Sequence, residues 1–178
     1  MKRYQILLLF LLSLFPTAVA AQKMAIKTNA LYWGTTTLNA ELEFATGRKT
    51  SILLLGAYNP WNFRDGKMMH VGAVQPEFRY WFCERFEGHF IGLHAHEAEF
   101  FGGLKKKRYD GHLVGTGLSW GYDWILSNHW NLEAEVGFGI NWVWYKQSDC
   151  IPCRKDYVRK KDHFLSPTKV ALSFVYVL

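Results

Sequence analysis

Polar and apolar residues alternate with a period of two over Asn131–Trp144. The odd positions of this segment are polar or glycine, and the even positions are apolar. Because successive side chains of a strand point to opposite faces, the pattern predicts a strand with one polar and one apolar face. Its length, and the tryptophans that close the apolar face, are typical of a transmembrane barrel strand.

The same alternation recurs along the chain and predicts eight strands. We expect them over Ile26–Trp33, Thr37–Phe44, Ser51–Tyr58, Val71–Phe82, His89–Ala98, Leu113–Trp124, Asn131–Trp144 and Thr168–Leu178. Short turns alternate with mostly longer connections, among them the predicted loops Gly102–Gly111 and Tyr145–Ser166. The predicted fold is all-β: an eight-stranded antiparallel up-and-down transmembrane β-barrel with short periplasmic turns and longer extracellular loops.

The N-terminal segment predicts export. Lys2 and Arg3 precede the apolar run Ile6–Phe15, which is too short to span a bilayer as a helix, and the small residues Ala18-Val19-Ala20 follow. We interpret residues 1–20 as a secretory signal peptide and residues 21–178 as the barrel domain, located in the bacterial outer membrane.

Aromatic residues make up 17% of the chain and are expected at both ends of the strands. Two aromatic girdles are typical of a barrel that crosses two membrane–water boundaries. The predicted outward aromatics are Tyr32, Tyr58, Trp142 and Trp144 beside the longer loops, and Phe44, Tyr80, Phe82, Trp120, Trp124 and Tyr176 beside the turns. A soluble lipocalin-like barrel, with its apolar face inward, is the alternative. Nucleic-acid binding does not fit an exported barrel of this kind.

The last predicted strand carries an alternating apolar face that ends the chain. Its members are Val170, Leu172, Phe174, Tyr176 and Leu178. This pattern resembles the signal that outer-membrane barrel assembly machinery reads, so we expect that machinery as a partner.

Charged residues fall on the inward face of several predicted strands. They are Lys27, Glu41, Glu43, Glu77, Arg79, Glu133, Glu135 and Lys169. An eight-stranded barrel has an interior just wide enough for side chains, and ions there need partners or trapped water. We predict a structural plug of ion pairs; the excess of Glu leaves a gated path for small solutes or ions as an alternative.

His94 and His96 lie two apart on the same inward face, where both rings would reach one metal ion. No third ligand is evident on a neighbouring strand, so we prefer a packed histidine pair and expect neither metal nor cofactor. Lipid-modifying enzymes also use barrels of this size, and His163 and Ser166 are the nearest base and nucleophile. We predict a non-enzymatic protein, with a lipid-modifying enzyme as the alternative.

Cys150 and Cys153 lie in the longest predicted loop, whereas Cys83 lies in a turn on the opposite side, roughly 25 Å away. A Cys150–Cys153 disulfide is the leading interpretation for an exported protein. A zinc site completed by His163, or two free thiols, remain open.

Basic runs occur in both long predicted loops. They comprise Lys105, Lys106, Lys107 and Arg108, and then Arg154, Lys155, Arg159, Lys160 and Lys161. Such runs are either solvated surface or a site for lipopolysaccharide phosphates. We hypothesise that the loop Tyr145–Ser166 docks a partner, because long loops on rigid scaffolds often carry binding residues.

Several short motifs resemble a known family. They are Asn59-Pro60-Trp61, Gln75 to Trp81, Gly88 to His94, Gly117 to Tyr122, Trp130 to Glu135, and the ending from Ser166. These motifs are similar to domain of unknown function 3575, found in Gram-negative bacteria that build surface fimbriae. The resemblance implies an exported outer-membrane protein with fimbrial or other envelope proteins as partners, and it provides no catalytic residues.

Overall fold

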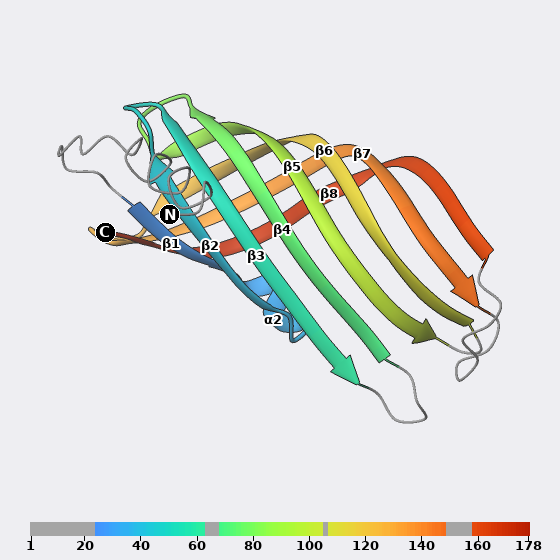
Figure 1. Cartoon of the computed structure of the whole chain (residues 1–178). Coiled ribbons are helices and arrows are strands. Elements are labelled where there is room, and N and C mark those ends of the chain that lie inside the picture. The colour runs from blue at the N-terminus through green and yellow to red at the C-terminus, as the bar shows by residue number, and fades with distance from the viewer. Residues whose placement is uncertain (1–23, 63–67, 105–106, 149–157) are drawn as a thin grey trace, which may run out of the picture.

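The structure is a computed structural model that describes residues 24–62, 68–104, 107–148 and 158–178. Within them are eight strands and one short helix (Figure 1). Their bounds are β1 Met24–Asn29, α2 Ala30–Gly34, β2 Leu38–Ala45, β3 Thr50–Asn62, β4 Met68–Trp81, β5 Gly88–Leu104, β6 Lys107–Ile125, β7 Trp130–Ser148 and β8 Val158–Val177. No helix in this part of the chain is long and apolar enough to cross a membrane.

Each strand pairs antiparallel with the next, and β1 pairs with β8, so the sheet closes on itself into a barrel. The all-β, eight-stranded meander that the alternation predicts is therefore confirmed. The segment that opened the prediction, now β7, pairs with β6 and β8 along nearly its whole length.

Two predicted loops are wrong, because the strands continue into them. The β5–β6 ladder runs to the pair Leu104↔Lys107, so most of Gly102–Gly111 is strand. The β7–β8 ladder runs to Gln147↔Val158, so most of Tyr145–Ser166 is strand as well. We predicted loops because these segments hold many charged residues. Strand pairing depends on backbone hydrogen bonds, however, and these form beyond the core without an apolar side-chain face.

The first predicted strand is also shorter than expected. β1 ends at Asn29, and residues Ala30–Gly34 form α2. The Asn29 side chain explains this ending, because its Oδ1 accepts hydrogen bonds from Leu31 N at 3.0 Å and Leu172 N at 3.2 Å. It thereby caps the helix and completes the β1–β8 contact.

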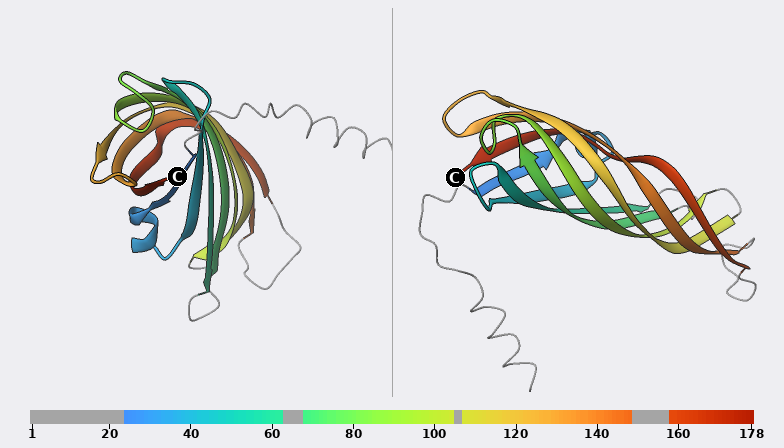
Figure 2. Two further views of the ribbon diagram at one scale, coloured as in Figure 1. Left: turned by 90° about the vertical axis from the view of Figure 1, so that its left-hand side faces the viewer. Right: turned by 90° about the horizontal axis from the view of Figure 1, so that it is seen from above.

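The barrel wall is consequently shorter at β1 and β2 than at the other strands. Strands β3–β8 run past the ends of these two and form a curved open sheet, which we name the projecting sheet (Figure 2). The turn side, where the termini of β1 and β8 meet, is the closed end of the molecule. The candidate site lies inside that closed part.

The predicted faces of the strands are as expected over the closed part. Inward positions of β4, such as Gln75, Glu77 and Arg79, are buried, whereas Phe78 and Tyr80 are exposed. The same holds for the apolar face of β8, where Val170, Leu172, Phe174 and Leu178 are exposed and Tyr176 is half-buried. The predicted aromatic face differs at Tyr32, which lies in α2 and is half-buried.

Some predictions fall outside the described residues. These are the signal peptide 1–20, Lys105, Lys106, Cys150, Cys153, Arg154 and Lys155.

Candidate functional site

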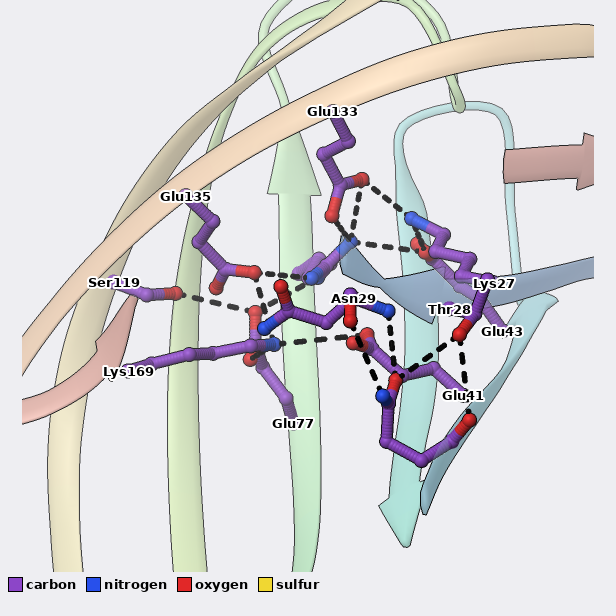
Figure 3. A network of polar contacts seen from close by, with 12 residues as sticks. Lys27, Thr28, Asn29, Glu41, Glu43, Glu77, Ser119, Glu133, Glu135 and Lys169 are labelled. Atoms are coloured by element: carbon purple, nitrogen blue, oxygen red, sulfur yellow. Dashed lines mark hydrogen bonds and ion pairs between the residues drawn. The ribbon is translucent and has the colours of Figure 1, made fainter. Parts of the chain in front are cut away.

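All eight inward charged residues predicted from the sequence lie together inside the barrel (Figure 3). They come from β1, β2, β4, β7 and β8, and each is at most 3% exposed. We name this set the charge network: Lys27, Glu41, Glu43, Glu77, Arg79, Glu133, Glu135 and Lys169.

Arg79 is the centre of the charge network. Its Nη1 donates to Glu43 on β2 at 3.0 Å and to Glu133 on β7 at 2.9 Å. Its Nη2 donates to Glu135 at 2.6 Å, and its Nε donates to Glu77 at 2.7 Å. Because β2, β4 and β7 are not neighbours in the sheet, these bonds cross the interior and brace opposite walls.

Each of the two lysines shares two carboxylates with Arg79. Lys27 Nζ contacts Glu43 at 2.5 Å and also Glu133. Lys169 Nζ lies 2.9 Å from both Glu77 and Glu135. Shared carboxylates with multiple donors are the arrangement in which buried charges are tolerated, because each ion keeps several partners after leaving water.

The interior also holds a carboxylate that the sequence analysis did not select. Asp123 on β6 is 1% exposed, and neither of its oxygens has a hydrogen-bond partner within the described residues. The signal for it was present, because Asp123 continues the inward odd positions of the predicted strand Leu113–Trp124. The described interior therefore holds more carboxylates than cations.

An apolar layer separates the charge network from the short turns. Trp81 and Phe90 pack with centroids 4.7 Å apart, and Phe86 from the β4–β5 turn lies 5.9 Å from Trp81. Arg79 lies 4.3 Å from the Phe90 centroid, so the two layers are in direct contact. Ala25, Val175 and Val177 complete the cluster. The sequence predicted a plug of ion pairs, and this apolar layer was not predicted, although Trp81 and Phe90 occupy inward positions.

The histidine pair lies on the other side of the charge network. Nε2 of His94 is 2.8 Å from Thr168 Oγ1, and Nε2 of His96 is 2.7 Å from Asn141 Oδ1. Their ring centroids are 5.8 Å apart. No group of three His, Cys, Asp or Glu suited to a metal ion occurs in the described part of the chain.

The other predicted chemical residues are separated. His163 pairs with Trp142 on the outward face of β8, whereas Ser166 pairs with Gly139 and accepts a hydrogen bond from Asn141 in the interior. A strand thus places the candidate base and nucleophile on opposite faces. Cys83 is an exposed free thiol.

The described residues of the two predicted basic runs lie in strands and not in loops. Arg159, Lys160 and Lys161 are exposed on β8. Lys107 and Arg108 open β6, where their backbone alone is described.

These features define an all-β protein whose closed sheet encloses a cross-braced set of buried ion pairs. The chain belongs to the family described as "Protein of unknown function (DUF3575)", whose model matches residues 6–178. The resemblance seen in the short motifs is thereby confirmed. No curated protein matches the chain.

Proposed function

We propose that this protein is an outer-membrane β-barrel with a closed interior, and that it has a non-enzymatic structural or interaction role at the bacterial cell surface. Its expected surroundings are outer-membrane lipid and lipopolysaccharide, with fimbrial or other envelope proteins as candidate partners.

The reversed polarity of the sheet carries this proposal. Lysine, arginine and glutamate side chains are buried, while large apolar side chains cover the outside: Leu118 is 68% exposed, Phe138 60% and Leu93 57%. Soluble proteins rarely expose continuous apolar surface of this extent, whereas a barrel in lipid requires it.

The dimensions of β7 support a membrane location. Between the outward residues Trp130 and Trp142, all outward side chains are apolar. Twelve residue steps measure about 40 Å along a strand, or about 30 Å along the axis of a barrel whose strands tilt by about 40°. This matches the hydrocarbon thickness between two aromatic girdles.

The charge network supports a closed interior over a pore. Arg79 reaches across the interior from β4 to Glu43 on β2 and Glu133 on β7, and the layer of Trp81, Phe86 and Phe90 lies beside it. Buried ion pairs are costly to separate, so thermal opening of this path is disfavoured.

The projecting sheet is the proposed interaction surface. Strands β6 and β7 have 19 residues each and β8 has 20, whereas about 9–11 residues cross a bilayer. The remainder extends beyond the membrane as a ladder and places its side chains at fixed positions. We therefore propose the projecting sheet as the docking surface, in place of the loop that we predicted over Tyr145–Ser166.

Membrane fractionation tests the proposal. We expect the protein in the outer-membrane fraction, and we expect unboiled protein to migrate faster than boiled protein in SDS gels. Recovery in a soluble fraction without heat-dependent migration would contradict it. Conductance of the purified protein in planar bilayers tests the closed interior, since stable single-channel steps would favour the pore. Lipid A analysis of a deletion strain tests the enzyme alternative.

A further inference from the structure

Three cations gather on the outward face of the projecting sheet. Lys146 on β7 lies directly opposite Arg159 on β8, and Lys161 follows two residues along the same face. All three are exposed, and within the described residues no carboxylate forms an ion pair with them. Like charges directly opposite on adjacent strands are destabilising, and an anion placed between them removes that cost.

Aromatic side chains flank this cationic site. Lys161 Nζ lies 5.7 Å from the centroid of the Trp144 ring, and the His112 ring stacks on Trp144 with the two centroids 5.1 Å apart. Asp110 lies opposite Lys146 on β6, and Glu99 lies opposite His112 on β5. The acidic groups therefore lie toward β5 and β6, while the β7–β8 half of the surface is cationic.

The cations border a hollow that adjoins a mainly apolar groove. The hollow has a volume of about 640 Å³ and is lined by Trp144, Lys146, Arg159 and Lys161 among others. The groove has a volume of about 880 Å³. Tyr58, Gly72 and Glu99 line both, so the hollow and the groove adjoin.

The groove has a floor of small residues and mainly apolar walls, with Glu97 and Glu99 of β5 at one side. Ala40 and Gly56 are directly paired and form the floor. Trp33, Leu38 and Val74 stand around them. This shape suits an extended hydrocarbon chain, because the larger side chains of Trp33, Leu38 and Val74 flank the small residues Ala40 and Gly56.

We propose that this surface binds an anionic lipid, with a headgroup phosphate between Lys146, Arg159 and Lys161 and an acyl chain in the groove. The inference rests on the proposed membrane location and specifies its lipid ligand. A phosphate dianion matches the paired cations, and Trp144 and Tyr58 lie where aromatic side chains mark a membrane–water boundary. A soluble anion would use the cations but not the groove.

The test is lipid binding by the full chain folded in neutral detergent, followed by native mass spectrometry. The probes are lipid A with two phosphates and the same glycolipid without phosphate. We expect at least tenfold tighter binding of the phosphorylated form, and a loss of at least tenfold in K146Q/R159Q/K161Q. The matched control, R48Q/K49Q/R85Q, removes three charges at the turn side and should bind as the unaltered protein does.

Equal binding of the two glycolipids, or equal losses in the two triple variants, would overturn the inference. So would full competition by inorganic phosphate at millimolar concentration, which would identify an anion site without a lipid component. Each variant is first checked for heat-dependent migration, so that a failure to fold is not counted as a loss of binding. Fractionation tests the membrane location separately: a protein that binds lipid A but does not enter membranes contradicts the proposed function alone.

Discussion

Thr168 and Lys169 are neighbours in β8, yet both side chains reach interior partners. Thr168 Oγ1 lies 2.8 Å from His94, and Lys169 Nζ lies 2.9 Å from Glu77. The pairing register shifts by one residue between Gly137 and Phe138, so Thr168 is the additional residue of a β-bulge. Such a bulge redirects a side chain without interrupting the sheet.

Replacing Thr168 by Val should destabilise the protein. The change keeps the side-chain volume and leaves Nε2 of buried His94 without its partner, which costs about 1–3 kcal/mol. Urea unfolding in lipid vesicles, followed by tryptophan fluorescence, measures the difference. The control is Thr46→Val, because the hydroxyl of Thr46 bonds Thr50 at an exposed turn. Equal effects of the two changes would assign no special role to the Thr168–His94 contact.

Replacing Arg79 by Met should be among the most damaging changes in the interior. It leaves Glu43, Glu133 and Glu135 without their shared cation, and removal of one partner of a buried ion pair costs about 3–5 kcal/mol. We expect a lower unfolding midpoint in urea. Neutralising two acceptors as well, in R79M/E133Q/E135Q, should recover part of the loss.

The control for Arg79 is Arg48→Met. Arg48 pairs with Glu84 at 2.8 Å, but both side chains are exposed, and such pairs contribute little. We therefore expect an unchanged midpoint. The cross-bracing role of the charge network would be refuted by an Arg79 variant as stable as the Arg48 variant.

Arg in place of Phe138 tests which face meets lipid. Phe138 is 60% exposed near the middle of the apolar stretch of β7, where an Arg facing hydrocarbon costs about 2–4 kcal/mol. The measurements are the yield of membrane-inserted protein and its unfolding free energy. His163→Arg is the control, since His163 pairs with Trp142 at the proposed girdle, and this change should cost about 0–1 kcal/mol. Similar costs at both positions would argue against a membrane boundary between them.

Alanine at Gly139 should destabilise the β6–β7 contact. An added Cβ would lie 2.2 Å from Thr116 O and 2.7 Å from the Cα of Gly117, and backbone atoms cannot move away as a flexible side chain does. Overpacking of this kind costs about 1–3 kcal/mol. Gly34→Ala is the control, because nothing lies within 4 Å of its added Cβ. Thermal unfolding followed by circular dichroism compares the two, and equal melting temperatures would show that the β6–β7 backbones can separate.

The sequence by itself determined the number of strands and the face of most side chains. Side-chain direction in a strand is a local property with a period of two, so Glu133 and Glu135 could be assigned to one face and Phe138 to the other. Local alternation likewise placed Arg79 inward. The same alternation, followed along Leu113–Trp124 to its end, also predicts that Asp123 points inward.

Only the tertiary structure decided which residues meet, because register and closure are long-range properties. Arg79 binds Glu133 across 54 residues of sequence, and no local pattern contains that pairing. The bulge at Thr168 shifts the alternation by one residue, which turns Arg159 and Lys161 to the same face as Lys146. Side-chain periodicity is fixed by the strand itself, whereas partners are chosen by the pairing of whole strands and by the closure of the sheet.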